Sequence, residues 1–294
     1  MSRLLDALQS GEVLLMDGAM GTELQRAGLP AATCCEAWNL TAPEPVRAVH
    51  EAYCTAGARV LVANTFQSNP AALARHDLAE KLTEINAAAL TIARTAAGSG
   101  FVLASVGPLE EPDQLDPVVR SLTAADGVLL ETWSDPVALF TLNAVTEPLR
   151  ELAGVPTLLS LTYLRRPDGK LATRSGHPPE WFAMQAEHYG VAALGVNCGR
   201  DIGLADVIEI IQRYRQATTL PLFARTNAGT PTRDGDRFVY PLTPAMLAQG
   251  LPPLLAAGAV MVGGCCGTTP EHIAAMRTVL DARKPEGNGA HPAV

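Results

Sequence analysis

Short apolar runs alternate with longer amphipathic stretches along most of the chain. Within each run successive positions are apolar, so both faces would be covered, as in the strands of a parallel sheet. Eight such runs are present, at Val13–Met16, Val60–Ala63, Val102–Val106, Gly127–Leu130, Thr157–Leu161, Ala192–Val196, Leu222–Ala224 and Val260–Gly263. The pattern therefore predicts eight buried parallel strands.

The stretches between these runs have helical periodicity and helical end signals. Pro136 follows Asp135 and Pro270 follows Thr269. Proline suits the first turn of a helix because its missing N–H would have no partner there. The predicted helices are Pro45–Ala56, Pro70–Ala97 (as two helices), Pro136–Leu152, Pro179–His188, Ile202–Gln216, Thr243–Ala257 and Pro270–Arg283.

Eight successive strand–helix units predict an α/β protein with a single (β/α)8 TIM barrel over residues 1–284. A doubly wound open sheet is the alternative, but no GxGxxG motif follows the first strand to support it. Three long loops, Ala31–Pro45, Thr162–Pro179 and Asn227–Pro241, each follow a strand and would lie at the C-terminal face of the barrel. Residues 285–294 are rich in glycine and proline, and we expect this tail to be disordered.

The composition excludes several classes of partner. The 294 residues carry a formal net charge of −8 without a basic block, so nucleic acid and anionic membranes are poor partners. No run approaches the roughly 20 apolar residues that a membrane-spanning helix needs, and Met1–Asp6 lacks the apolar core of a signal peptide. These features indicate a cytoplasmic protein, whose six cysteines would be free, buried or metal-bound rather than paired in disulfides.

Three cysteines follow two of the predicted strands. Cys198 comes just after Ala192–Val196, and the adjacent Cys265 and Cys266, flanked by glycines, come just after Val260–Gly263. Because the C-terminal ends of parallel strands face the same opening of a closed barrel, we expect the three thiols to lie close together there. Three thiolates with an open fourth position are typical of a catalytic Zn²⁺ site, and thiolates favour zinc over hard cations.

Two alternatives to a zinc site at these three cysteines remain open. Free cysteine is one of the residues most often buried, so Cys198, Cys265 and Cys266 could simply pack at strand ends. Cys34 and Cys35 form a second adjacent pair in the loop after the first strand and could bind a metal instead, although no glycines surround them.

The three-thiolate pattern also favours a type of reaction. Zinc bound by three thiolates has a net formal charge of about −1, so it is a weak Lewis acid for generating hydroxide. It suits a substrate thiol, which loses its proton on binding and remains nucleophilic. The cysteines therefore indicate alkyl transfer to a thiol rather than hydrolysis.

Several motifs resemble those of the zinc-dependent homocysteine S-methyltransferase family, which includes betaine–homocysteine methyltransferase and the homocysteine module of cobalamin-dependent methionine synthase. The similar segments are Met16–Leu24, Trp38–Leu40, Ala56–Ala58, Asn64–Phe66, Asn197–Cys198 and Gly263–Thr268. The resemblance implies that residues 1–284 form a homocysteine-binding (β/α)8 barrel with one zinc ion. It also implies homocysteine as the methyl acceptor and methionine as the product.

The resemblance assigns Cys198, Cys265 and Cys266 as the zinc ligands. Asn227 falls where the family usually carries Pro-Asn-Ala-Gly and is implied as a contact near the substrate. Here Thr226 replaces that proline, so the turn beside the zinc could differ in shape.

Four further residues match the part of the family site that holds the amino-acid end of homocysteine. Asp17 and Gly18 match its first segment, Thr65 a second contact, and Glu131 the carboxylate that faces the substrate ammonium. An α-amino acid needs an anion beside its ammonium and N–H donors beside its carboxylate, and the two acids and the Gly18–Gly21 turn could supply them. Alternatively, Asp17 and Glu131 could only cap the following helices.

The methyl donor is not identified by these motifs. A small onium compound, S-methylmethionine or betaine, is the favoured donor, and aromatic side chains could bind its charge. Candidates at the mouth of the barrel are Phe66, Trp133, Tyr163 and Trp181. One alternative is a module that takes its methyl group from a separate corrinoid or folate protein. Another, of a different class, is a non-catalytic barrel that binds zinc or a thiol.

Overall fold

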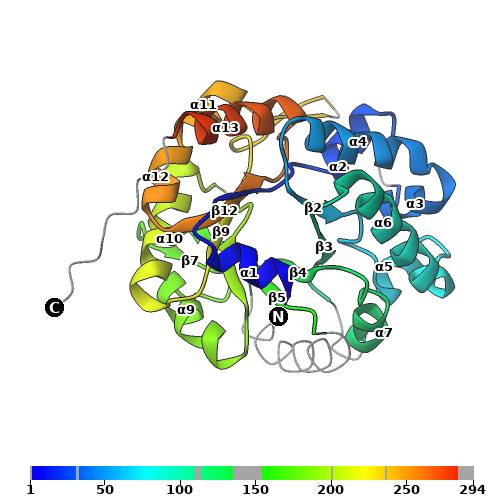
Figure 1. The fold of residues 1–294 in the computed structure, drawn as a ribbon, viewed down its shortest axis with the longest axis horizontal. Helices are drawn as coiled ribbons and strands as arrows, with labels where there is room; N and C mark the ends of the chain where they lie inside the picture. The colour runs from blue at the N-terminus through cyan, green and yellow to red at the C-terminus, as the bar shows by residue number, and fades with distance from the viewer. Residues whose placement is uncertain are drawn as a thin grey trace.

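The computed structural model describes residues 2–30, 33–109, 114–134, 154–199, 201–235 and 237–283. Eight parallel strands form one ring in the order β1-β12-β9-β8-β5-β4-β3-β2 (Figure 1). A bridge between Met16 and Val60 joins β1 to β2. The strands are β1 Leu14–Leu15, β2 Val60–Ala63, β3 Phe101–Val106, β4 Gly127–Trp133, β5 Thr157–Leu161, β8 Ala193–Val196, β9 Leu222–Thr226 and β12 Ala259–Gly264. The predicted TIM barrel is thus confirmed.

Helices surround the ring on its outer side, and the first of them lies across its N-terminal end (Figure 1). They are α1 Arg3–Gln9, α2 Gly21–Arg26, α3 Trp38–Thr41, α4 Pro43–Thr55, α5 Pro70–Ala74, α6 Leu82–Ala97, α7 Leu115–Arg120, α9 Pro179–His188, α10 Leu204–Ala217, α11 Pro244–Gln249, α12 Leu251–Ala256 and α13 Pro270–Ala282. The predicted helix Pro136–Leu152 and the tail 285–294 lie outside the described residues.

Most helix predictions within the described residues are confirmed, and one is wrong. Pro70–Ala97 contains the two helices α5 and α6, as predicted. Thr243–Ala257 is not one helix, because α11 ends and α12 begins at Gly250. The prolines in the first turn of α12 lack the N–H groups that would continue the hydrogen bonds of α11.

Alternate strand residues face two separate apolar layers. Leu129 and Phe223 point into the ring and belong to its inner cluster. Leu130, the next residue along β4, belongs to the outer cluster between the ring and the helices. Leu4 and Leu8 of α1 join the inner cluster and pack against its N-terminal end.

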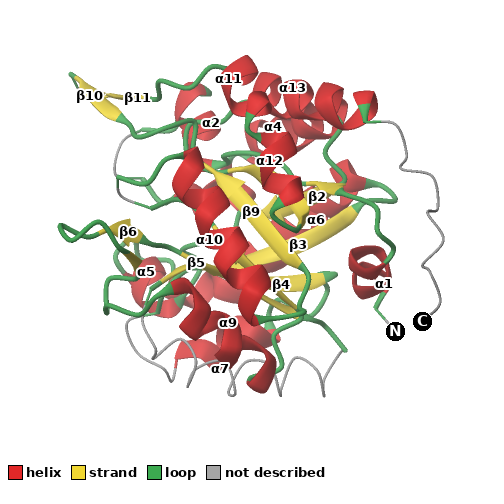
Figure 2. Ribbon diagram, turned by 90° about the vertical axis from the view of Figure 1, so that its left-hand side faces the viewer, coloured by secondary structure: helices red, strands yellow, loops and turns green. Residues whose placement is uncertain are grey.

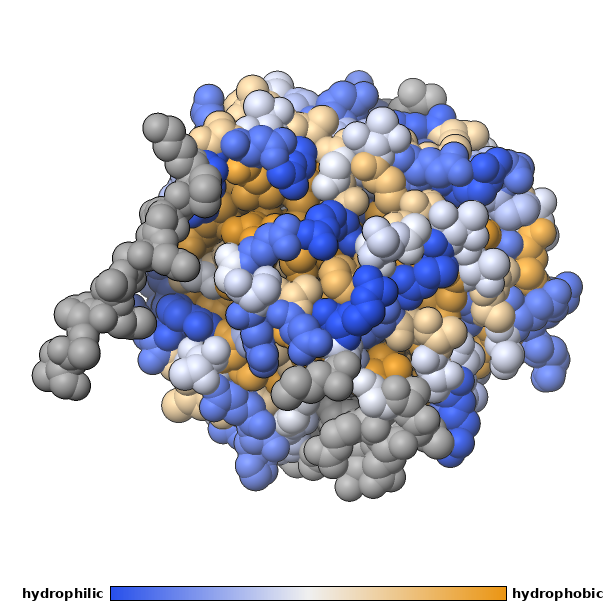
Figure 3. All heavy atoms as spheres, in the orientation of Figure 1, coloured by the Kyte–Doolittle hydropathy of each residue, from blue (hydrophilic) through white to orange (hydrophobic). Residues whose placement is uncertain are grey.

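Helix α1 covers the N-terminal end of the ring. Its polar residues Arg3, Asp6 and Gln9 are exposed, and Figure 3 shows hydrophilic side chains crossing this face above apolar ones. The inner cluster is therefore sealed at this end, which leaves the opposite end for a binding site.

The loops that follow the strands gather at the C-terminal end. Two of the predicted long loops contain short hairpins, β6 Leu164–Arg165 with β7 Leu171–Ala172 and β10 Thr232–Asp234 with β11 Arg237–Val239. Figure 2 shows β6, β10 and β11 on the side of the molecule away from α1. No helix in the described part of the chain is long and apolar enough to cross a membrane.

Candidate functional site

Three thiols lie together at the C-terminal end of the ring. Cys198 follows β8, Cys265 and Cys266 follow β12, and β9 lies between these two strands. The three Sγ atoms all lie within 4.8 Å of one another. Over the described ranges no other group of three potential metal ligands comes this close, so Cys34 and Cys35 do not belong to one.

The chemistry of this cluster suits one soft metal ion. Thiolates favour zinc, which binds sulfur at about 2.3 Å, and the sulfur separations allow a single ion between them. Hydrogen bonds from the Cys198 and Cys265 thiols lower the pKa of Cys266, whereas hydrogen bonds to Cys265 and Cys266 raise the pKa of Cys198. The cluster thus favours a thiolate on one sulfur, the form that binds a metal.

Backbone hydrogen bonds fix the two adjacent cysteines. The Cys265 N–H donates to the Thr226 carbonyl at 2.8 Å, and the Ala228 N–H donates to the Cys266 carbonyl at 3.0 Å. Gly267 follows with a φ of +78°, which favours glycine because a Cβ would be strained there. The cysteine pair is therefore held by β9 on one side and a glycine turn on the other.

Asp17 and Glu131 are buried at the ends of β1 and β4, and both bind Arg225. Arg225 Nη2 donates to Asp17 Oδ1 at 3.1 Å, and Arg225 Nη1 is paired with Glu131 Oε1. Asp17 Oδ2 accepts from the Val62 N–H at 2.7 Å, and Glu131 Oε2 accepts from the Ser105 hydroxyl at 2.8 Å. Each carboxylate therefore uses one oxygen for the arginine and the other for a neutral donor.

Arg225 is the site residue that the sequence analysis missed. It directly follows the apolar run Leu222–Ala224, and a lone cation at a strand's C-terminal end could have signalled a partner for the predicted acids. Burial raises the pKa of Asp17 to about 7 and also raises that of Glu131, while Arg225 opposes both shifts. With both acids ionised, the buried cluster has a net charge of −1.

Gly18 and Thr65 lie beside these charged groups. The Gly18 carbonyl accepts from Arg225 at 3.2 Å. A Cβ on Gly18 would lie 2.6 Å from a threonine hydroxyl in the loop after β12, so this residue packs directly on the segment that follows the cysteines. Thr65 Oγ1 donates to the Ser105 carbonyl and accepts from the Ser105 N–H, at 2.8 and 2.9 Å. Thr65 therefore holds the residue that donates to Glu131.

Asn197 connects the end of β4 with the thiol cluster. Its Oδ1 accepts from the Thr132 N–H at 3.1 Å and the Ser160 hydroxyl at 2.7 Å. Its Nδ2 donates to Thr132 Oγ1 at 2.7 Å and to Cys198 Sγ at 3.3 Å. Thr132 has a φ of +67°, an unfavourable conformation for a β-branched residue. Asn197 thus secures a strained backbone directly after Glu131 while it contacts a thiol.

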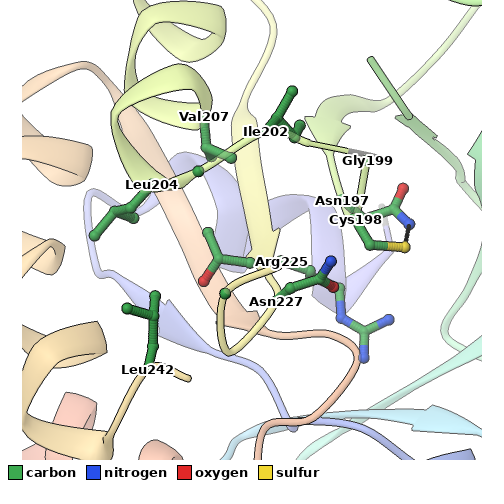
Figure 4. Close-up of a pocket in the computed structure, with 12 residues that line it drawn as sticks. Asn197, Cys198, Gly199, Ile202, Leu204, Val207, Arg225, Asn227 and Leu242 are labelled. Atoms are coloured by element: carbon green, nitrogen blue, oxygen red, sulfur yellow. Dashed lines mark hydrogen bonds between the residues drawn. The ribbon is translucent and has the colours of Figure 1, made fainter. Parts of the chain in front are cut away.

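Asn227 lines a small cavity between the thiol cluster and α10 (Figure 4). The cavity measures about 20 Å³, which has room for about one water molecule. Asn227 Oδ1 is buried without a hydrogen-bond partner among the described residues. The structure therefore places Asn227 near Cys198, but without a direct hydrogen bond to Asp17 or Glu131.

Comparison with known proteins identifies the relatives of this chain. The family model for homocysteine S-methyltransferase matches residues 14–280. The chain belongs to the homocysteine S-methyltransferase family. This membership confirms the resemblance on which the sequence analysis relied.

The individual relatives of this chain differ in length. The methionine synthase of Mycobacterium leprae is 31% identical over 313 residues, which cover 94% of this chain and 25% of that protein. The methionine synthase of Mycobacterium tuberculosis is 31% identical over 315 residues, covering 96% and 26%. The chain thus spans about a quarter of the length of these curated relatives. The metallated homocysteine methyltransferase MmuM from Escherichia coli is 28% identical with a TM-score of 0.75, covering 92% of this chain and 99% of that one.

Two of the four aromatic residues expected at the mouth of the barrel are elsewhere. Trp133 and Tyr163 are 5% and 2% exposed and pack in the layer between strands and helices, so that prediction was wrong for both. Phe66 and Trp181 are partly buried and stay candidates. Tyr240, which the sequence analysis did not single out, packs its ring on the glycine after the cysteine pair.

Asn197→Ala tests the link between β4 and the thiols. We expect a loss of about 2–4 kcal/mol in the free energy of unfolding, because the Thr132 N–H and the Ser160 hydroxyl lose their acceptor. Zinc affinity should fall about 10- to 100-fold, as expected for the loss of a group that orients a ligand. Urea unfolding and competition with a chelator measure the two effects.

Asn86→Ala is the matched control for that variant. Asn86 is a buried asparagine of α6 that donates to the Ser121 hydroxyl at 2.7 Å, away from the thiols. The Asn86→Ala variant should have a lower free energy of unfolding and an unchanged zinc affinity. Equal zinc affinities for both variants would show that Asn197 only stabilises the fold.

Proposed function

We propose that the chain binds one zinc ion through Cys198, Cys265 and Cys266 and transfers a methyl group from a small onium donor to homocysteine. The observation that carries this proposal is the position of three thiols next to a buried pair of carboxylates. The first group of side chains suits the sulfur end of the substrate, and the second suits its ammonium end. A single small amino acid with a terminal thiol satisfies both.

The thiol cluster supplies the binding site for the metal and for the substrate sulfur. Zinc held there would bind the homocysteine sulfur as a nucleophilic thiolate. Asn197 donates to Cys198 and so orients that ligand. In the reaction a new bond forms between the homocysteine sulfur and the methyl carbon, while the bond from that carbon to the onium atom of the donor breaks. The substrate thiol proton leaves to solvent.

The carboxylates and the turn after β1 orient the amino-acid end of homocysteine. Asp17 and Glu131 would face the ammonium, each through lone pairs that Arg225 leaves free. Ala19 donates its N–H to a threonine hydroxyl at 3.1 Å. The N–H groups of Gly18 and Met20 have no partner among the described residues, and these would meet the substrate carboxylate. This orientation lowers the barrier by holding the sulfur in place.

A small onium donor, S-methylmethionine or betaine, is supported by the relatives of similar length. The alignment with MmuM covers 99% of a homocysteine methyltransferase chain, so one barrel accounts for all of that protein. Phe66 and Trp181 are the remaining candidates to bind the positive charge of the donor. The second candidate is a separate corrinoid or folate protein as methyl source. It is favoured by the 31% identity to methionine synthases, of which the chain spans only about a quarter.

A panel of methyl donors tests this proposal. Zinc-loaded protein is incubated with homocysteine and, in separate reactions, with S-methylmethionine, betaine, methylcobalamin or methyltetrahydrofolate. We expect methionine from S-methylmethionine or betaine. Methionine from methylcobalamin or methyltetrahydrofolate alone would favour the second candidate, and no methionine from any donor or added corrinoid protein would reject both.

Homocysteine affinity should fall as the pH drops below about 7, because burial raises the pKa of Asp17 to that value. An acid is protonated below its pKa, and protonated Asp17 offers no negative charge to the substrate ammonium. Isothermal titration across this range measures the change. Binding also releases the substrate thiol proton, so affinity falls as the pH drops in both wild type and Asp17→Asn. Wild type should show an additional fall below about pH 7 that Asp17→Asn lacks, and equal pH profiles would assign the fall to another group.

A further inference from the structure

Arg225 lies in the middle of the proposed ammonium site, although its side chain is itself a cation. It points from β9 to the inside of the ring, and its guanidinium bonds to Asp17, Glu131 and the Gly18 carbonyl. Figure 4 shows the guanidinium on the side of Cys198, away from Leu204. The arginine side chain is 5% exposed, and the two acid side chains are 2% and 8% exposed.

The charges explain why a cation is needed at this place. Two buried carboxylates that converge on one point repel each other, and one of them would be protonated without a positive partner. The three thiols nearby add negative charge when they bind a metal. Arg225 brings the charge of the acid pair from −2 to −1. One substrate ammonium then makes the cluster neutral.

The carboxylates can still accept the substrate ammonium while Arg225 is bound. An ionised carboxylate has about four lone-pair sites, and Asp17 and Glu131 each use one for Arg225 and one for a neutral donor. The guanidinium is less available to the substrate carboxylate, because its two terminal nitrogens already bind these acids and Nε, which has no partner among the described residues, is buried. Contacts and charge therefore favour an indirect role.

We propose that Arg225 is a positioning residue for the ammonium group of the acceptor: it favours the ionised forms of Asp17 and Glu131 and aims both carboxylates at one point. The inference rests on the proposed orientation of homocysteine and adds a specificity determinant from β9. Two other roles predict different results. A guanidinium that pairs with the substrate carboxylate would select for that group, and one that occupies the ammonium position would weaken amine binding.

Three small thiol ligands distinguish these roles experimentally. They are homocysteine, homocysteamine, which lacks the carboxylate, and γ-mercaptobutyrate, which lacks the ammonium. Their dissociation constants are measured by isothermal titration with zinc-loaded wild type, Arg225→Gln and Arg225→Lys. We expect Arg225→Gln to weaken homocysteine and homocysteamine about 10- to 100-fold, the range for a lost charged hydrogen bond, and γ-mercaptobutyrate hardly at all. Arg225→Lys keeps the charge without the planar fork and should recover part of the loss.

Arg213→Gln is the matched control. Arg213 of α10 is also a paired arginine, bound to Glu180 of α9 at 2.9 Å on the outside of the barrel. The Arg213→Gln variant should bind all three thiol ligands with the affinities of wild type. Zinc content and circular dichroism, recorded for every variant, show whether a loss of binding comes from misfolding. If Arg225→Gln does not fold, two other variants are compared with wild type. One is the double variant Asp17→Asn/Arg225→Gln, whose buried cluster again has a net charge of −1, and the other is Arg225→Lys.

Each outcome decides between the roles. Equal loss for γ-mercaptobutyrate and homocysteine, with homocysteamine unchanged, would overturn the proposal in favour of direct carboxylate binding. Tighter homocysteamine binding in Arg225→Gln would show that the guanidinium blocks the ammonium position. Unchanged affinities in both Arg225 variants would make the residue purely structural. If wild type binds none of the thiols, the proposed function fails rather than the role of Arg225.

Discussion

Cys266→Ala is expected to reduce bound zinc from about one equivalent per chain to less than half, since two thiolates bind this ion far more weakly than three. The value of kcat/KM for homocysteine should fall roughly a thousandfold or more, because the variant loses both the metal and the activated substrate thiolate. Metal analysis of protein purified without chelator gives the first result, and methionine formation gives the second.

Cys54→Ala is the control for this variant. Cys54 is a partly buried thiol of α4 that donates to the Ala96 carbonyl at 3.3 Å, and its loss should change neither zinc content nor kcat/KM. Unchanged zinc content in Cys266→Ala would contradict the assignment of this thiol as a ligand. Zinc lost equally from Cys54→Ala would show that zinc binding does not report on the cluster.

Glu131→Gln should raise the KM for homocysteine about 10- to 100-fold with a smaller change in kcat. The variant keeps the shape of the side chain but removes the negative charge that the ammonium would meet, and a hydrogen bond to a charged group contributes about 1.5–3 kcal/mol. Binding weakens in the ground state and in the transition state alike, so KM carries most of the effect. Initial rates at varied homocysteine concentration measure both parameters.

Asp126→Asn is the control variant for Glu131→Gln, because it also removes a carboxylate next to β4. Asp126 precedes β4 at the opposite end of the ring, where it accepts from the Val102 N–H at 2.7 Å and pairs with Arg94. It should lower the free energy of unfolding without changing the KM. A normal KM in Glu131→Gln would remove this carboxylate from the proposed ammonium site.

The fold followed from the sequence because local pattern and global architecture agree. Every strand of a TIM barrel is covered on both faces, and this chain shows a short apolar run at each one. The place of Cys198 after an apolar run predicted its position at the barrel opening, whereas Asp17 and Glu131 were predicted from the family resemblance; all three lie at strand ends. Parallel strands carry their C-terminal residues to one opening, so sequence position alone predicts that these groups converge.

The sequence could not predict the contacts between distant strands. Arg225 was not predicted, because nothing local shows that a strand residue reaches two acids across the ring. Trp133 and Tyr163 were expected at the mouth. An irregularity in β4 between Leu130 and Trp133 interrupts the strand alternation and places Trp133 in the outer apolar layer. Tyr163 lies in the same layer, where it hydrogen-bonds to Tyr214 of α10. The break at Gly250 was missed because the prolines of α12 continue an apolar pattern that looks like one helix.

Methyl transfer to homocysteine by the zinc-loaded protein can be followed directly with a labelled donor. Protein with one bound zinc is given homocysteine and S-methylmethionine carrying a labelled methyl group, and labelled methionine is followed over time. We expect labelled methionine from wild type and Cys54→Ala, and none from Cys266→Ala or chelator-treated protein. Equal methionine formation by wild type and Cys266→Ala would contradict zinc-dependent transfer at the thiol cluster.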